Sequence, residues 1–260
     1  GNTDADSFDV TVQDTTAPTL IGTPANFTVE ATMASGAVVT YTSPTATDIA
    51  DASVIPSCIP ASGSTFALGN TTVTCTATDD SANNATSTFT VNVVDTTAPI
   101  VTVPADIFAE ATNSTGATVT FSATATDAVD GSPAVSCVPP SGSTFAIDVT
   151  TLVTCTSTDS NSNTGTASFN ITVNDTTAPI VTVPADITVE ATSPSGATVT
   201  YASSATDAVD GTPAVSCVPP SGSIFPIGTT LTTCSSTDAH TNTGAASFNI
   251  TVVDTTGPVF

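Results

Sequence analysis

The sequence predicts an all-β fold made of tandem β-sandwich domains arranged as an extended rod. The pentapeptide DTTAP begins at Asp14, Asp95 and Asp175 and returns as DTTGP at Asp254, so one unit of about 80 residues is repeated. Within each unit, short runs alternate apolar and polar residues, which is the period of a strand, and no helical period appears. A unit of this length is large enough to enclose a small core of its own.

The repeat gives the domain boundaries. We expect domains at residues 14–94, 95–174 and 175–253. Residues 1–13 match the last strand of a preceding repeat, because SFDVTVQ at Ser7–Gln13 resembles the SFNITVN that closes the second repeat, and residues 254–260 match the start of a following one. We therefore expect this chain to be a segment, or a processed piece, of a longer protein with further repeats.

In the second repeat, the alternating runs are bounded by Gly, Pro, Asn and Asp, and this pattern is typical of an antiparallel sandwich. The repeat predicts strands over Ile100–Glu110, Ala117–Phe121, a run ending at Cys137, a short piece near Phe145, Thr151–Thr158 and Ser168–Asn174.

The charge balance is one-sided. Lys and Arg are absent, 23 residues are Asp or Glu, and the formal net charge is −23. Nothing in such a chain can neutralise phosphates, which excludes nucleic acid as a partner. There is also no run of about 18 apolar residues, so no membrane insertion is expected in these residues. Cations are the natural counter-species.

Six cysteines fall two to a repeat with nearly equal spacing. Because the pairs lack CxxC and neighbouring His, they favour one disulfide in each repeat and a location outside the cytoplasm; the alternative is buried free thiols. Each closed loop would contribute about 3 kcal/mol in the chain-entropy model. The predicted pairs are Cys58 with Cys75, Cys137 with Cys155, and Cys217 with Cys234.

The third repeat runs PADITVEATSPSGATVTY, then ATDAVDGTPAVSCVPPSGSIFPIGTTLTTCSSTDAHTNTG, and closes with SFNITVVD. This pattern resembles the HYR (hyalin repeat) module, and the resemblance covers all three repeats. It implies immunoglobulin-like extracellular domains associated with adhesion, and no catalytic motif. Two departures stand out: Asp148 lies where the flanking repeats have Gly69 and Gly228, and Thr232 replaces the apolar Val73 and Val153, which would loosen the third core.

Acidic residues recur at fixed places in each repeat: at the end of the first strand, in the next loop, at the final turn and in the linker. Carboxylates that converge without Lys or Arg repel one another unless a hard cation with oxygen ligands lies among them. We therefore expect Ca²⁺ at the repeat junctions; the alternatives are that these Asp residues only form turns, or that another cation binds there. The predicted ligands are Glu30 with Asp95, Asp127, Asp130 and Asp159, and Glu110 with Asp175, Asp207, Asp210 and Asp238.

Several Asn residues lie in N-x-S/T sequences, and in a chain so rich in Thr and Ser many of these matches arise by chance. Two of them point outward on the predicted last strands. The candidate N-glycosylation sites are Asn26, Asn70, Asn84, Asn113, Asn170, Asn174 and Asn249.

His240 is the sole histidine, and its place in the final turn of the third repeat indicates a surface turn residue. Nucleophilic catalysis therefore lacks a base, no zinc motif exists, and no Gly-rich phosphate loop follows a strand. Paired Asp could hydrolyse glycosides, but a pair present in every repeat is better explained structurally. We do not expect an enzyme.

The leading interpretation is a structural extracellular protein of a filament, surface layer or adhesin stalk, whose partners are copies of itself. The alternative is a binding module whose exposed loops recognise a cell-surface receptor or glycan, with avidity supplied by the array. The second and third repeats share the loops DAVDG and CVPPSGS verbatim, and identical loops favour a repeated structural contact.

Overall fold

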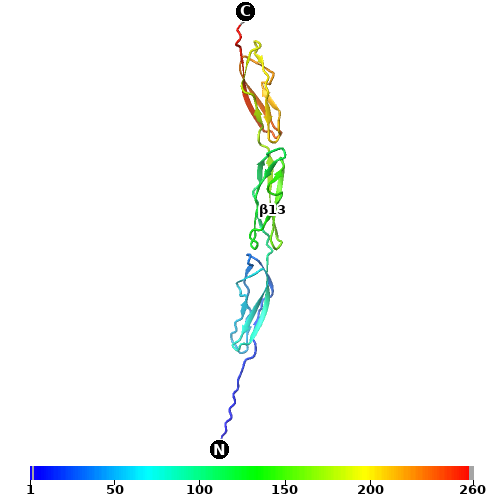
Figure 1. The fold of residues 1–260 in the computed structure, drawn as a ribbon. Coiled ribbons are helices and arrows are strands. Elements are labelled where there is room, and N and C mark those ends of the chain that lie inside the picture. Colours follow the sequence, from blue (N-terminus) through cyan, green and yellow to red (C-terminus); the bar gives the residue numbers. More distant parts are fainter. Residues whose placement is uncertain (2, 258–260) are drawn as a thin grey trace. The chain divides into compact units, whose positions relative to one another are not determined.

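The structure is a computed structural model that describes residues 1 and 3–257, and these contain strands but no helix. Contacts divide the chain into two compact units. Figure 1 draws the described strands, coloured along the sequence. The first unit comprises Gly1–Val101, Thr124–Val135 and Thr156–Thr166, and the second comprises Thr102–Ala123, Ser136–Cys155 and the residues from Ala167 onward. The names first, second and third repeat are used below for residues 14–94, 95–174 and 175–253.

The first unit is built on a long antiparallel hairpin, in which Val73 lies opposite Phe89. A short strand runs parallel to one side of the hairpin and another runs antiparallel to its other side, giving a four-stranded sheet of order β2-β8-β7-β5. Its strands are β1 (Thr19–Ile21), β2 (Phe27–Glu30), β3 (Ala37–Val39), β4 (Thr45–Thr47), β5 (Ser57–Ile59), β6 (Ser64–Phe66), β7 (Gly69–Thr78), β8 (Asn84–Val94), β9 (Ile100–Thr102) and β12 (Thr124–Thr126), with β1–β4, β3–β6 and β9–β12 as two-stranded ladders.

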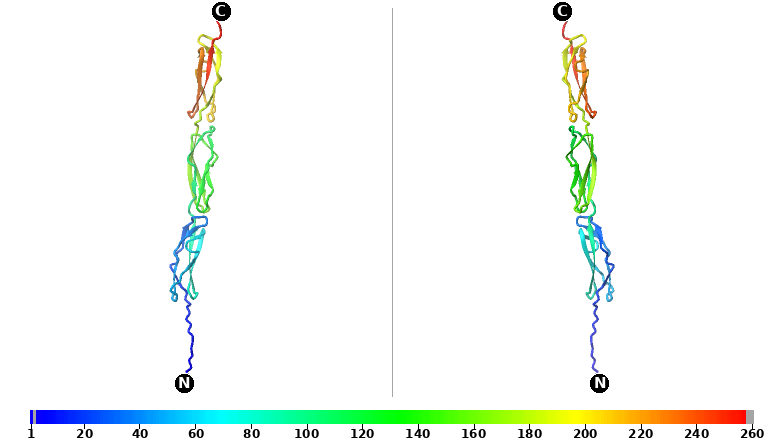
Figure 2. Two further views of the ribbon diagram at one scale, coloured as in Figure 1. Left: turned by 90° about the vertical axis from the view of Figure 1, so that its left-hand side faces the viewer. Right: turned by 90° about the vertical axis from the view of Figure 1, so that its right-hand side faces the viewer.

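The second unit repeats this plan in sheets of order β10-β16-β15-β13 and β18-β24-β23-β21, with the ladders β11–β14, β17–β20 and β19–β22. The hairpin β23–β24, orange to red, stays side by side in both further views (Figure 2). The strands are β10 (Ile107–Glu110), β11 (Ala117–Val119), β13 (Val135–Val138), β14 (Ser143–Phe145), β15 (Thr150–Thr158), β16 (Thr164–Asn174), β17 (Ile180–Thr182), β18 (Ile187–Glu190), β19 (Ala197–Thr198), β20 (Ser204–Thr206), β21 (Val215–Val218), β22 (Ile224–Phe225), β23 (Gly228–Thr237) and β24 (Thr243–Val253).

The period-two pattern explains each core. In the first repeat, Val73, Phe89 and Val91 of the large sheet are almost fully buried, and they pack against Val39 and Phe66 of the β3–β6 ladder. The core therefore lies between the sheet and the ladder, as in a sandwich. An edge-on aromatic pair closes one end of it: the ring centroids of Tyr41–Phe89, Phe121–Phe169 and Tyr201–Phe248 are each 5.0 Å apart.

The predicted disulfides are confirmed in all three repeats, between Cys58 and Cys75, Cys137 and Cys155, and Cys217 and Cys234. In the first and third repeats, the two cysteines lie directly opposite each other in the ladder of adjacent strands. Each bond therefore fastens the short edge strand to the long hairpin rather than one layer to the other.

Two strand predictions need correction, and a third, the assignment of Ser7–Gln13 to the last strand of a preceding repeat, stays a prediction. The single strand predicted over Ile100–Glu110 is two strands, β9 and β10, which pair with different partners; Pro104, which has no N–H to donate, lies between them. Strand β11 ends at Val119, short of the predicted Phe121. Ser7–Gln13 forms no strand, and Phe8, Val10 and Val12 are 86%, 73% and 92% exposed, because the described chain offers this segment no partner strand. Residues 258–260 of the expected following repeat lie outside the described residues.

Candidate metal centres at the start of each repeat

The final turn of each repeat is organised by an aspartate. In the second repeat, Asp159 Oδ1 accepts hydrogen bonds from the backbone N–H groups of Asn161 and Asn163, both at 2.8 Å, and its Oδ2 accepts one from Asn163 Nδ2 at 2.8 Å. Burial disfavours the charged carboxylate, but these hydrogen bonds outweigh burial and lower the pKa of Asp159. Asp79 and Asp238 hold their turns in the same way.

The same turn fastens the linker. Asn163 Nδ2 also donates to the carbonyl oxygen of Asp95 at 3.2 Å, and Asn242 does so to Asp175 at 3.2 Å. Asn83 makes the corresponding bond to Asp14. The sequence reasoning overlooked these asparagines, although D-x-x-x-N recurs in all three final turns and was the signal that could have found them.

The loop between β12 and β13 supplies the next acids. Asp127 Oδ1 accepts hydrogen bonds from the N–H groups of Val129 and Asp130, at 2.8 and 2.9 Å, in a local turn. The backbone groups of Asp127 and Gly131 bond to each other in both directions, at 2.8 and 3.1 Å. The loop is thereby closed, and it directs Asp130 toward the linker.

Carboxylates from these three segments converge. In each converging group, one oxygen from every member lies within 4.8 Å of one from every other member. Two oxygens on opposite sides of one Ca²⁺, bound at about 2.3–2.6 Å, are separated by about 4.6–5.2 Å, so each group fits a single coordination sphere. The groups are Asp14, Asp48, Asp51 and Asp79 in the first repeat, Asp95, Asp130 and Asp159 in the second, and Asp175, Asp207 and Asp238 in the third.

The linker aspartates carry buried oxygens with no hydrogen-bond partner. Asp95 is 5% exposed and Asp175 6% exposed, and the Oδ2 atom of each accepts no hydrogen bond. Burial, followed by repulsion from neighbouring acids, raises the pKa of both groups. The Oδ2 atoms of Asp14, Asp48, Asp130 and Asp207 are unpartnered as well. Buried acceptors are normally satisfied, and these oxygens are free to take a cation as their partner.

Glu30 and Glu110 were predicted as ligands from the neighbouring repeat, but they are not members of the converging groups. Glu110 Oε1 accepts hydrogen bonds from Thr176 N and Thr177 Oγ1, at 2.8 and 2.6 Å, and its Oε2 accepts one from Thr176 Oγ1 at 2.7 Å. These bonds lower the pKa of Glu110 to about 2. Glu30 and Glu190 hold the following DTT segments in the same manner. The glutamates therefore fix the linker beside the acidic cluster, and their role as ligands stays a prediction.

Val129 gives the loop a second contact. It lies between Asp127 and Asp130, and its side chain packs against the buried core of the first repeat. The segment that supplies a carboxylate to the second repeat's cluster thus also touches the preceding repeat. An ion held by Asp130 would restrain both.

His240 lies in a turn, as the sequence indicated, but it also contacts three carboxylates. Its Nδ1 lies 3.2 Å from Asp210 Oδ2 and 3.3 Å from Asp175 Oδ2, and its Nε2 lies 3.1 Å from Asp148 Oδ2. The hydrogen bond with Asp210 raises the pKa of His240 most, and Asp148 raises it further, against an opposing effect of burial. No pattern in the sequence linked His240 to Asp148, 92 positions away.

The HYR domain pattern matches the chain three times, at residues 13–93, 94–173 and 174–252. This chain belongs to the HYR domain family. It is 36% identical over 238 residues to hyalin of Strongylocentrotus purpuratus and 37% identical over 237 residues to hyalin of Lytechinus variegatus. Each alignment covers 86% of this chain, but only 20% and 44% of the two hyalins.

Among solved structures, the HYR chain is similar to mouse cadherin-23 EC22-24, with 15% identity, a TM-score of 0.32, and coverage of 92% of this chain and 99% of that one. It is also similar to Sidekick-1 immunoglobulin domains 1-5, with 16% identity, a TM-score of 0.33, and coverage of 93% and 60%. The HYR repeats are all-β and immunoglobulin-like, and their disulfides are typical of extracellular proteins.

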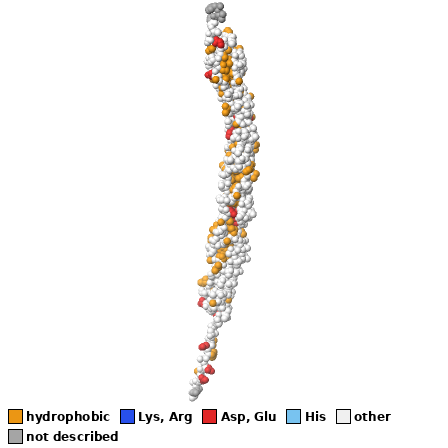
Figure 3. Space-filling view, viewed as in Figure 1, with side chains coloured by type: hydrophobic (Ala, Val, Ile, Leu, Met, Phe, Trp, Pro, Cys, Tyr) orange, Lys and Arg blue, Asp and Glu red, His pale blue; other side chains and the backbone are white. Residues whose placement is uncertain are grey.

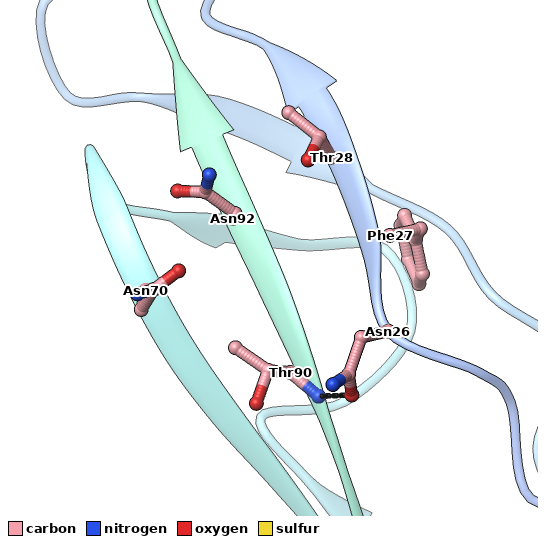
Figure 4. Close-up of a pocket in the computed structure, with 6 residues that line it drawn as sticks. All are labelled: Asn26, Phe27, Thr28, Asn70, Thr90 and Asn92. Carbon is pink, nitrogen blue, oxygen red and sulfur yellow. Dashed lines mark hydrogen bonds between the residues drawn. The ribbon is translucent and has the colours of Figure 1, made fainter.

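The candidate glycosylation sites differ in access. Asn170 and Asn249 are half-buried, and their side-chain amides donate to Asp106 and Asp186, each at 3.2 Å. Asn26 and Asn70 are exposed and line a shallow hollow of about 390 Å³ with Thr90 and Asn92, where Asn26 Oδ1 accepts a 2.7 Å bond from Thr90 N (Figure 4). Asn84, Asn113 and Asn174 are exposed.

The HYR repeats have no Lys or Arg on their surface. On the face drawn in Figure 3, a few acidic side chains stand among uncharged and apolar ones. Within the described residues, no helix is of a length and hydrophobicity that would let it cross a membrane.

Proposed function

We propose that this chain is part of an extracellular structural protein of a filament, surface layer or adhesin stalk at the cell surface, in which each HYR repeat binds Ca²⁺ at its acidic cluster. The observation that carries the proposal is the unpartnered, buried Oδ2 atom of the linker aspartates Asp95 and Asp175. Each is surrounded by further carboxylates, and the chain has no Lys or Arg to neutralise them.

Calcium suits these clusters better than other common cations. It takes six to eight oxygen ligands in a flexible arrangement, and carboxylates, backbone carbonyls and water all serve. In the first two repeats, Asp is the only residue type in the clusters, and such hard oxygen donors disfavour soft metals. Water would complete the shell around Asp95, Asp130 and Asp159.

The proposed mechanism is mechanical. The linker of the second repeat is tied to the first repeat through Glu30, which accepts hydrogen bonds from Thr96 and Thr97, and Val129 packs on the first core. An ion between Asp95 and Asp130 would lock that linker to that loop. Binding would therefore restrict bending where one repeat meets the next, and the partners would be other copies of the same protein.

Calcium titration of the whole chain tests the proposal. A ligand bound only by the folded state adds about 2.7 kcal/mol at a hundred times its Kd, so Ca²⁺ is expected to raise the Tm, and EDTA to lower it. Asp95→Asn should weaken the effect, whereas Asp9→Asn, at an exposed residue before the first repeat, should not. An unchanged Tm after chelation would refute calcium binding.

Scattering separates stiffening from mere binding. Small-angle X-ray scattering of the same protein should show a broader distribution of distances in EDTA than in calcium. If calcium raised the Tm but left the scattering unchanged, the clusters would be stabilising sites without the mechanical role.

A further inference from the structure

The third repeat differs from the others at one position of its cluster. His240 occurs two residues after Asp238, where the first and second repeats have Ser81 and Asn161. Its Nδ1 faces Asp175 and Asp210, and one atom from each of these three residues lies within 4.8 Å of one from the others. Among the clusters of the described residues, this one alone combines carboxylates with an imidazole.

We propose that the third repeat holds a site for a borderline first-row dication such as Zn²⁺, with His240 Nδ1, Asp175 and Asp210 as its protein ligands. The inference rests on the proposed role of the acidic clusters as cation sites. It specifies which class of cation binds at the cluster that contains His240. An imidazole nitrogen is a preferred ligand of Zn²⁺ and similar ions, whereas Ca²⁺ takes oxygen.

The distances support a single ion. Ligands about 2.0–2.1 Å from a tetrahedral Zn²⁺ are separated from one another by about 3.3 Å. His240 Nδ1 lies 3.2 Å from Asp210 Oδ2 and 3.3 Å from Asp175 Oδ2. The Asp175 side chain is 1% exposed, and its Oδ2 accepts no hydrogen bond. Asp175 Oδ2, which is buried and accepts no hydrogen bond, thus lies within ion-pairing distance of the ring nitrogen, at a separation that a shared metal also allows.

Asp148 completes the arrangement as a positioning residue. Histidine ligands usually donate their second ring N–H to a carboxylate, which fixes the tautomer and orients the ring. Asp148 Oδ2 lies 3.1 Å from His240 Nε2, on the side of the ring away from Asp175. With the proton on Nε2, the Nδ1 lone pair faces the two ligand carboxylates. Asp148 and His240 are both departures from the repeat pattern, and they meet at this ring.

Because His240 is the only histidine, its ring nitrogens can be followed without ambiguity in ¹⁵N-labelled whole chain. One equivalent of Zn²⁺ should shift the Nδ1 resonance strongly through a direct metal–nitrogen bond, whereas Ca²⁺, which binds only the neighbouring carboxylate oxygens, should shift it far less. By calorimetry, His240→Asn, which installs the residue of the second repeat, should weaken Zn²⁺ binding at least tenfold. Asp148→Gly, which installs the residue of the flanking repeats, should shift the Nε2 resonance and weaken Zn²⁺ binding about tenfold.

An unmoved Nδ1 resonance, or an unchanged Zn²⁺ isotherm in His240→Asn, would overturn the inference. Both variants use residues that this fold already carries at the same position, so loss of binding is not loss of folding; the Tm of each variant checks this. The calcium proposal can fail independently of this inference. In that case the Tm would not change after chelation, but Zn²⁺ would still shift the Nδ1 resonance of His240.

Discussion

Thr97 donates its hydroxyl hydrogen to Glu30 Oε1 across 2.7 Å, and so joins the linker of the second repeat to the end of strand β2 in the first. The two residues are 67 positions apart. Thr177 and Glu110 form the same pair in the next repeat, at 2.6 Å. A glutamate that the sequence assigned to a metal therefore works through the threonines of DTTAP.

This pair predicts an acid-sensitive component of stability. The pKa of Glu110 falls from 4.5 to about 2 on folding, so its contribution is fully present above the unfolded pKa and is lost as pH falls from about 4.5 toward 2. Since Glu110 is exposed, screening limits the contribution to about 1 kcal/mol. Urea unfolding should show Glu110→Gln less stable by this amount at pH 7, with the difference shrinking below pH 4.5 and vanishing only below pH 2. A constant difference at both pH values would contradict this origin.

Asn163 should matter both to stability and to cation binding, because it holds the Asp95 carbonyl and the Asp159 carboxylate together. Asn163→Ala is expected to cost about 1–2 kcal/mol of unfolding free energy and to weaken calcium binding several-fold. Asn161→Ser, which installs the first-repeat residue, is the matched control and should change little. Equal calcium affinity in Asn163→Ala and the wild type would show that the linker needs no such anchor.

Thr232 is a local defect of the third core. It is fully buried opposite Phe248, and its hydroxyl has no hydrogen-bond partner, whereas Val73 occupies this place in the first repeat. Thr232→Val should raise the free energy of unfolding by about 1 kcal/mol, measured by urea denaturation. Val153→Thr, the reverse change in the second repeat, should lower it by about 1–2 kcal/mol. A Thr232→Val protein no more stable than the wild type would point to an unseen partner for the hydroxyl.

Gly116 admits no side chain. Its φ is +117°, and a Cβ there would lie 1.8 Å from the Phe145 carbonyl oxygen, at the start of the β11–β14 ladder. Gly116→Ala should cost about 3 kcal/mol, combining backbone strain with displacement of β14. Gly142 also has positive φ but open space around it, so Gly142→Ala should cost only about 1 kcal/mol. Thermal unfolding of the two variants compares them directly; similar losses would mean that β14 moves aside freely.

The sequence predicted the long strands well, because alternation of apolar and polar residues over a run such as Thr151–Thr158 is typical of a strand and not of a helix. It predicted the disulfides well because each repeat holds only two cysteines. It failed where the signal is short. Strand β12 has only three residues, and the break between β9 and β10 depends on which neighbour each half pairs with. Neither the short strand β12 nor the break between β9 and β10 can be read from the alternation of apolar and polar residues.

For the candidate sites, the repeated acidic residues could be identified from the sequence, but which of them join a cluster and which hold the linker could not. The sequence assigned Glu30 and Asp95 alike to a metal, since both are carboxylates expected near one junction. Their different roles depend on hydrogen bonds from Thr96 and Thr97, which only the folded linker brings to Glu30. Likewise, the meeting of His240 with Asp148 depends on contacts between the second and third repeats.

All four members of the first cluster, Asp14, Asp48, Asp51 and Asp79, belong to the first repeat, Asp14 being its first residue. The cluster borrows no carboxylate from a neighbour. Duplication or deletion of the gene segment that encodes one such repeat therefore adds or removes a complete cluster and leaves no incomplete one. An array of this kind can change in length by whole repeats while every remaining repeat keeps its full set of acids.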